Sequence, residues 1–337
     1  MSEEPFVIVG AGAIGAIVGA HLIDSGHEVV FVEANRDHVA AIRAHGLKVT
    51  GEVDFTVRPK VYLPKEYRGT TGRMLLAVKS RHTIEALEPL AQFVAPDGVV
   101  LSLQNGLEED KIKAIVGPER TVGAFITFGG YYVKPGEVHY GGAGSFMVGE
   151  LDGSRTPRVE ALAKAFSHQQ TVVVTDNIYG CLWGKMCLGA VYFGTAIVDA
   201  AVQEIYADAQ CRAILGRIAG EAVSVADAHG VRTESVDGFD PKVFRPGGPA
   251  DPAAVAAAWE AQLHYWNSHD NTHTGVWRDL KIHKRKTEVD HQVGAIIAKA
   301  EEAGVDVPLL RRLKATVETI ERGEQPQSFD RLKEVAG

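Results

Sequence analysis

Three glycines near the start of the chain have the spacing that brings a main chain close to a phosphate. Residues 7–15 read VIVGAGAIG, a short apolar strand that runs through a GxGxxG loop into a helix. In such a loop Gly10 permits the tight turn, Gly12 lets the backbone approach a pyrophosphate, and Gly15 lets the helix pack closely on the strand. The N–H groups and positive dipole of the helix start would face the anion. The alternative is a glycine-rich turn packed for steric reasons. The prediction is a dinucleotide-binding loop that also includes Ala11, Ala13 and Ile14.

An acidic residue ends the second apolar run, 18 positions beyond Gly15. A carboxylate there, Glu33, would accept hydrogen bonds from the 2′-hydroxyl of the adenosine ribose and would repel a 2′-phosphate. This favours NAD over NADP as the cofactor. In the alternative interpretation Glu33 faces solvent, and Asn35 and Arg36 accept a phosphate.

The elements that must position this loop alternate between short apolar runs and helical patterns, as in a parallel sheet covered by helices. A β-rich stretch around the Lys134-Pro135-Gly136 turn then predicts a hairpin that adds antiparallel strands to the sheet. The predicted strands are 6–9, 28–33, 73–78, 98–103 and 172–175, the hairpin arms are 121–133 and 137–150, and the predicted helices are 14–24, 37–45, 82–94 and 158–168.

Beyond residue 176 strand patterns almost disappear and helical patterns dominate. The expected fold class is α/β, with an N-terminal Rossmann-type dinucleotide-binding domain at 1–176 and an all-α C-terminal domain at 177–337 that supplies the substrate and catalytic groups. Helices are expected at 177–201, 203–229, 252–268, 275–303 and 307–322, with a loop at 237–249.

Composition excludes several function classes. The formal charge of −8 opposes binding to nucleic acid or to an anionic membrane surface, and no apolar run is long enough to span a bilayer. The three cysteines form no CxxC pair, so no disulfide framework or zinc site is expected. A cytoplasmic protein with a small-molecule substrate is predicted, and the apolar helix faces could support a homodimer.

Further motifs extend the pattern across the chain. With the GAGAIG start, the segments LAVK at 76–79, LQNG at 103–106, LWGK at 182–185 and KTEVD at 286–290 stand in an order that resembles the ketopantoate reductase (2-dehydropantoate 2-reductase) family. The resemblance covers nearly the full length. It implies a Rossmann domain joined to a helical domain, with the active site between them.

The resemblance also implies roles for individual residues. Lys185 matches the general acid of ketone reduction, Glu288 the glutamate that closes on cofactor and substrate, Asn105 an asparagine that contacts both, and Lys79 a lysine that lines the cleft. A lysine suits the role because hydride transfer to a carbonyl leaves an alkoxide that needs a proton. Without the resemblance, Lys185 would be interpreted as a lysine whose aliphatic chain covers apolar surface with its amine in water. Glu288 would be interpreted as the partner of Lys284 in a surface ion pair on a long helix.

The sequence departs from the family around the substrate. The asparagines usual four and eight residues beyond the lysine are replaced by Gly189 and Phe193, which would put empty space and an aromatic ring on that helix face. A bulkier or less polar substrate than ketopantoate is therefore expected. The expected substrate-contacting residues are Lys79, Asn105, Lys185, Gly189, Tyr192, Phe193, His273 and Thr274.

His273 stands where the family places a substrate-binding hydroxyl, and a histidine there could relay protons. The alternative is a loop histidine in a polar run. His269 and His273 have a spacing compatible with metal binding, but no third ligand is evident, so no metal is expected.

The sequence thus predicts an NAD-dependent oxidoreductase that acts on a 2-hydroxy acid or a similar secondary alcohol or ketone, with Lys185 as acid and base. NADP is the less favoured cofactor. Two rival hypotheses remain: an authentic 2-dehydropantoate 2-reductase of pantothenate and coenzyme A synthesis, and a non-catalytic protein that senses NAD(H).

Overall fold

The structure, a computed structural model, describes residues 4–247, 251–268 and 271–337. The chain divides into two compact units, Met1–Ile178 and Tyr179–Gly337. The division falls two residues beyond the boundary expected at residue 176.

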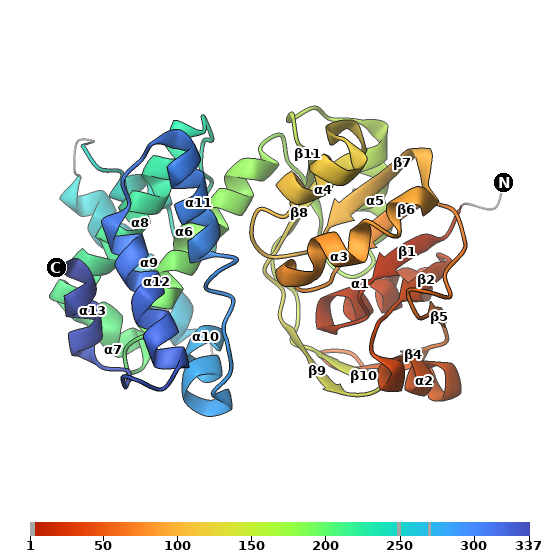
Figure 1. The fold of residues 1–337 in the computed structure, drawn as a ribbon, viewed down its shortest axis with the longest axis horizontal. Helices are drawn as coiled ribbons and strands as arrows, with labels where there is room; N and C mark the ends of the chain where they lie inside the picture. Colours follow the sequence, from red (N-terminus) through yellow and green to blue (C-terminus); the bar gives the residue numbers. More distant parts are fainter. Residues whose placement is uncertain (1–3, 248–250, 269–270) are drawn as a thin grey trace. The chain divides into compact units, whose positions relative to one another are not determined.

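An eight-stranded sheet forms the centre of the first unit, in the order β12-β11-β8-β7-β6-β1-β2-β5 (Figure 1). β5, β2, β1, β6, β7 and β8 run parallel, and β11 pairs antiparallel with β8. The α/β class is therefore confirmed. The strands are β1 (Phe6–Val9), β2 (Val29–Val32), β5 (Lys60–Tyr62), β6 (Thr71–Leu76), β7 (Val94–Ser102), β8 (Thr121–Ile126), β11 (Phe146–Glu150) and β12 (Val173–Val174).

Helices cover both faces of this sheet. Alternate residues of β1 enter different cores: Phe6 and Ile8 pack with residues of α1 and α5, and Val7 and Val9 pack with residues of α3 and α4. β1 is thus buried on both sides, as expected for a central parallel strand. The helices are α1 (Ala13–Asp24), α2 (Arg36–His45), α3 (Thr83–Leu87), α4 (Glu109–Val116) and α5 (Pro157–Phe166).

A second, four-stranded sheet in the order β4-β3-β10-β9 differs from expectation. The Lys134-Pro135-Gly136 turn does join two antiparallel strands, β9 (Gly130–Lys134) and β10 (Glu137–Tyr140). However, β10 then pairs in parallel with β3 (Leu47–Gly51), which in turn pairs with β4 (Phe55–Val57). Of the strands in this stretch, β8 and β11 join the main sheet, but only β11 is antiparallel to its neighbour β8, and the hairpin itself belongs to another sheet. The helix expected at 82–94 is also wrong, because α3 is flanked by 3₁₀ turns at Ser80–His82 and Ala91–Phe93.

In its described part the second unit is built of helices and the loops that join them, with one isolated bridge between Val236 and Phe239. The helix expected at 203–229 is two helices, because Asp208 leaves the helical conformation and caps the second one through the backbone N–H of Cys211. The helices are α6 (Ile178–Ala196), α7 (Val202–Ala207), α8 (Ala209–Ala228), α9 (Pro252–Asn267), α10 (Gly275–Arg278), α11 (Val293–Ala303), α12 (Pro308–Glu321) and α13 (Phe329–Ala336).

The single helix expected at 275–303 is wrong as well. α10 continues into a π-helical turn at Asp279–His283 and ends at Lys284, which is left-handed with φ of 48°. A non-helical stretch then carries the TEVD motif up to α11. Within the described ranges, none of the helices combines the length and apolar character needed to traverse a bilayer.

Candidate active site

The glycine loop lies at the point where the strand order of the main sheet reverses. β1 pairs with β2 on one side and with β6 on the other. The backbone N–H of Gly10 donates to the Val32 carbonyl at 2.8 Å, and that of Ala77 donates to the Val9 carbonyl at 2.9 Å. In parallel sheets such a switch point is where ligands bind, beyond the carboxyl ends of the strands.

The three glycines of the loop differ in what a side chain at each position would meet. Gly10 has φ of +97°, and a β-carbon on it would lie 2.9 Å from the Val78 nitrogen. A β-carbon on Gly15 would lie 2.9 Å from the side chain of Ala77. Gly12, at the start of α1, has open space where its side chain would be. A backbone bare at this position beside a helix start fits a pyrophosphate group.

Glu33 is partly buried at the end of β2, where its carboxylate holds the loop. Oε2 accepts from the Ala11 N–H at 2.7 Å, and Oε1 accepts from the Asn35 N–H at 2.7 Å. The Asn35 side-chain oxygen caps α2 by accepting from the N–H groups of Asp37 and His38, each at 3.1 Å. Asn35 therefore serves the helix start, whereas Glu33 places a negative charge directly beside the loop.

His38 is a site residue that the sequence reasoning missed. Its ring is 1% exposed. Nδ1 accepts from the Gly136 N–H at 2.9 Å, so Nε2 carries the proton and donates to the Ala11 carbonyl at 2.8 Å. His38 thus ties the glycine loop to the β9–β10 turn. No sequence signal marks it, because Gly136 lies 98 positions away.

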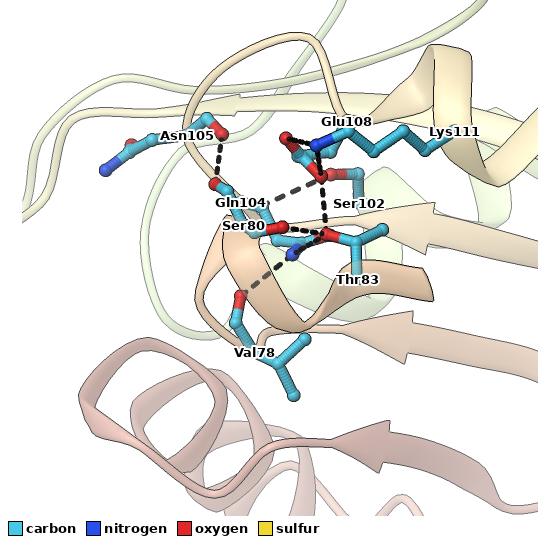
Figure 2. A network of polar contacts seen from close by, with 8 residues as sticks. All are labelled: Val78, Ser80, Thr83, Ser102, Gln104, Asn105, Glu108 and Lys111. Carbon is cyan, nitrogen blue, oxygen red and sulfur yellow. Dashed lines mark hydrogen bonds and ion pairs between the residues drawn. The ribbon is translucent and has the colours of Figure 1, made fainter. Parts of the chain in front are cut away.

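A hydrogen-bond network at the ends of β6 and β7 joins the loop that carries Ser80, next to Lys79, to the loop that carries Asn105 (Figure 2). The Ser80 hydroxyl donates to the Asn105 carbonyl at 2.9 Å. The Gln104 amide donates to the Val78 carbonyl and to the Thr83 hydroxyl, both at 2.8 Å. The side chains of Lys79 and Asn105 themselves are exposed. Ser80 and Gln104, neither of which was anticipated, fix these loops at the same edge as the glycine loop.

In the second unit Lys185 lies in the first half of α6, in a surrounding that disfavours its charge. The side chain keeps some exposed surface, but burial of its amine lowers the pKa of Lys185 to about 8, against the opposing effects of Asp237 and Glu288. Asp237 stands three residues beyond Glu234. The Glu234 backbone approaches α6 so closely that a β-carbon on Gly184 would lie 2.1 Å from the Glu234 carbonyl. A lysine with a pKa near neutrality can both give and take a proton.

Glu288 belongs to a turn anchored on α12. The Thr287 N–H donates to the Glu321 carboxylate at 2.7 Å, and Asp290 forms an ion pair with Lys314 at 2.8 Å. The alternative, an ion pair between Glu288 and Lys284 on one helix, is wrong because Lys284 lies in the left-handed break before this turn and the two residues do not share a helix. The anchored turn leaves the Glu288 carboxylate near enough to Lys185 to oppose part of the lowering of the lysine pKa.

The expected empty space at Gly189 is contradicted by the structure. A β-carbon on Gly189 would lie 2.9 Å from Oε1 of Gln292, so a carboxamide occupies that space. Phe193 is 1% exposed and belongs to the core of the unit. Tyr192 packs edge-on against Trp266 at 5.6 Å, and burial raises its pKa well above the usual range.

His273 and Thr274 lie where the segment before α10 meets the connection between α6 and α7. The Val202 N–H donates to the Thr272 carbonyl at 2.9 Å, and Lys281 pairs with Asp199 at 2.7 Å. The His273 ring rests on Trp277 with 3.8 Å between the centroids, and desolvation lowers its pKa. The Thr274 hydroxyl accepts from the Trp277 N–H at 3.1 Å and so caps α10.

These contacts tie the segment of His273 to residues that follow α6, which ends eleven residues beyond Lys185, a rise of about 16 Å. In the part of the chain that the structure describes, no three metal-binding side chains gather; His269 lies outside the described residues.

The Rossmann-type unit with its glycine loop and the helical unit with its desolvated lysine define an oxidoreductase acting on CH–OH groups. The chain belongs to the ketopantoate reductase family: residues 6–153 match the family model "Ketopantoate reductase PanE/ApbA", and residues 177–321 match its C-terminal counterpart. Both the resemblance and the fold expected from the sequence are thereby confirmed.

Individual relatives agree with this membership. A 2-dehydropantoate 2-reductase of Streptococcus pyogenes serotype M3 (strain ATCC BAA-595 / MGAS315) is 25% identical over 314 residues, which cover 92% of this chain and 95% of the relative. A PanE/ApbA family ketopantoate reductase from Ralstonia eutropha JMP134 superposes with a TM-score of 0.77 at 27% identity, over 95% of this chain and 99% of the other. A D-mandelate dehydrogenase solved with NADH and anilino(oxo)acetate shares the fold, with a TM-score of 0.78 at 24% identity over 94% and 99% of the two chains.

Proposed function

We propose that this protein interconverts a 2-oxo acid and a 2-hydroxy acid, or a similar ketone and secondary alcohol, with Lys185 as the general acid and base. The observation that carries the proposal is the desolvated amine of Lys185, whose pKa of about 8 lies close to physiological pH. An ordinary surface lysine would hold its proton too tightly to act as a base.

NAD(H) is the proposed cofactor. The residues that would hold it are the glycine loop at 10–15, Glu33, Lys79, Asn105 and, from the helical unit, Glu288. Glu33 places its charge beside Ala11, where it would disfavour a 2′-phosphate. At about 4 Å and an effective dielectric of about 20, each such repulsion costs on the order of 4 kcal/mol. Bound cofactor supplies the hydride in reduction and accepts it in oxidation.

The protein's own part in the reaction is the movement of one proton. In reduction the Lys185 ammonium donates its proton to the oxygen of the forming alkoxide, and in oxidation the neutral amine accepts the hydroxyl proton. Asp237 and Glu288 favour the ammonium form and so limit the fall of its pKa. Lys79 and Asn105, with backbones fixed by the Ser80 and Gln104 bonds, would orient the substrate and the cofactor.

A second candidate is an authentic 2-dehydropantoate 2-reductase. Two observations favour it. The Streptococcus relative, a 2-dehydropantoate 2-reductase, aligns over 92% of this chain, and the Gln292 amide puts a polar group in the space beside Gly189. Ketopantoate and 3,3-dimethyl-2-oxobutanoate have the same carbon skeleton and differ only in one hydroxyl group. A higher kcat/KM for ketopantoate would favour this candidate, whereas a higher value for the deoxy compound would favour a less polar substrate.

The test of catalysis is NADH consumption with a panel of 2-oxo acids, including phenylglyoxylate, ketopantoate and 3,3-dimethyl-2-oxobutanoate. Lys185→Met should lower kcat by about 10² to 10⁴-fold for the preferred substrate. Lys333→Met, at an exposed lysine of α13, is the matched control and should leave kcat unchanged. A wild-type protein without 2-oxo acid-dependent NADH consumption, or a fully active Lys185→Met variant, would overturn the proposal.

Cofactor choice has its own test. Glu33→Gln keeps an oxygen that can accept from the Ala11 N–H but removes the charge. The ratio of kcat/KM for NADPH to that for NADH should rise at least about tenfold in this variant. A wild-type enzyme that prefers NADPH would contradict the proposed cofactor.

A further inference from the structure

One turn of α6, from Lys185 to Gly189, faces one turn of the segment that follows the left-handed break, from Glu288 to Gln292. Gly189 stands four residues beyond Lys185, on the same helix face. Gln292 stands four residues beyond Glu288, and its N–H donates to the Glu288 carbonyl at 3.0 Å. Glu288 acts on the charge of Lys185, and the Gln292 carboxamide lies against Gly189. The two segments therefore meet at Gly189 and Gln292, with Glu288 close enough to influence the charge of Lys185.

The closeness of Gln292 to α6 depends on the missing side chain at position 189. Oε1 lies 2.9 Å from the place that a β-carbon on Gly189 would take, a distance shorter than ordinary van der Waals contact. Any larger residue on α6 would displace the amide. The glycine is therefore what lets a carboxamide from another segment approach α6 at a position one helical turn, about 5.4 Å along the axis, beyond Lys185.

The anchoring of the segment fixes the direction from which this amide approaches. Thr287 and Asp290 are bound to α12 through Glu321 and Lys314, and Val289 is fully buried. Gln292 itself is partly exposed, and among the described residues its carboxamide makes no hydrogen bond. An amide held in place, with its donor and acceptor unused, can bind an oxygen of a ligand.

We propose that Gln292 is a substrate-binding residue that places a carboxamide beside Lys185 in the space left by Gly189, where it hydrogen-bonds an oxygen of the substrate next to the reacting carbonyl. This role rests on the proposed function of Lys185. The oxygen belongs to the substrate carboxylate, which every 2-oxo acid carries, or to a hydroxyl further along its chain. Both are recognised by the same amide chemistry, and matched substrates separate them.

The experiment moves the amide from one segment to the other. Gln292→Ala removes it, and Gln292→Ala combined with Gly189→Asn restores an amide from α6 in the vacated space. Gln210→Leu, at an exposed glutamine of α8, is the control. Each protein is assayed with ketopantoate and with 3,3-dimethyl-2-oxobutanoate at saturating NADH, and the Kd of the unreactive analogue oxamate is measured calorimetrically in the presence of NADH.

Gln292→Ala should raise the substrate KM about tenfold, change kcat less than threefold and leave the KM for NADH unchanged, and the double variant should recover most of the loss. If the amide binds the carboxylate, both substrates and oxamate lose affinity. If it binds the hydroxyl, only ketopantoate does.

Changes below twofold in both KM values and in the oxamate Kd would overturn the role of Gln292, even where Lys185→Met abolishes turnover. Conversely, an enzyme that binds oxamate through Gln292 but reduces neither compound would contradict the proposed function alone.

Discussion

A β-carbon placed on Gly15 would lie 2.1 Å from the carbonyl oxygen of Gly10, whereas one placed on Gly12 would meet nothing within 4 Å. The two glycines of one loop therefore serve different ends. Gly15→Ala should lower the free energy of unfolding by about 2 kcal/mol, because the loop backbone must shift. Gly12→Ala should change it by less than about 0.5 kcal/mol but raise the KM for NADH about tenfold, since the methyl group would stand where the pyrophosphate approaches.

Urea unfolding and NADH titration of the two variants separate these effects. The proposed cofactor site would be wrong if Gly12→Ala bound NADH as well as the wild type does. The packing argument would be wrong if Gly15→Ala were as stable as Gly12→Ala.

Substitution of His38 would disturb the glycine loop without changing any residue of the loop itself. In His38→Phe the Ala11 carbonyl and the Gly136 N–H lose their partner in a buried place, which should cost about 2 kcal/mol of stability. The KM for NADH should rise several-fold while the KM for the 2-oxo acid stays constant, because only the cofactor loop loosens. His45→Phe, at the exposed end of the same helix, is the control. Equal changes in both KM values would indicate a general loss of structure instead of loop positioning.

Local sequence signals predicted the parts of this fold that depend on neighbours along the chain. The strand, the glycine loop and α1 were placed correctly because an apolar run, the glycine spacing and a helical pattern are all signals carried by consecutive residues. The second sheet was missed because β10 pairs with β3, with Glu137 opposite Lys48, and no short-range pattern encodes that partnership. The break at Lys284 was missed because a lysine carries none of the signals that glycine or proline gives.

The candidate site shows the same division. Periodicity and spacing alone gave Lys185 no special role; the family resemblance assigned it, and burial together with Asp237 and Glu288 supplies the physical reason. Gly189 was correctly noted as an absent side chain, but what fills its place comes from Gln292, more than a hundred positions away. The sequence shows locally that a side chain is missing at position 189, but the group that fills its space is recognised only from a tertiary contact.

Glu109 is a buried acid whose titration should be visible in stability. It is 0% exposed at the start of α4, its carboxylate oxygens have no hydrogen-bond partner among the described residues, and burial raises its pKa to about 8. Between pH 4.5 and 8 the native state keeps a proton that the unfolded state releases, so this group's contribution to stability falls as pH rises through that window. Glu109→Gln should remove the fall.

The measurement is the difference in unfolding free energy between Glu109→Gln and the wild type at several pH values. The variant should gain on the order of 5 kcal/mol relative to the wild type between pH 4.5 and 8, and the difference should stay constant above pH 8. A difference that does not vary with pH would show that Glu109 is ionised in the folded protein.

The lowered pKa of Lys185 also predicts opposite pH profiles for the two directions of the reaction. Reduction needs the ammonium, so its kcat/KM, which reports ionisations of the free enzyme, should be constant below pH 8 and fall about tenfold per pH unit above it. Oxidation needs the neutral amine, so its kcat/KM should rise up to pH 8 and then level off. Lys185→Arg, which stays protonated at all these values, should abolish the descending limb of reduction and nearly all oxidation. Descending limbs that persist in Lys185→Arg would assign the titration to another group, because only an ionisation of Lys185 itself can disappear with that substitution.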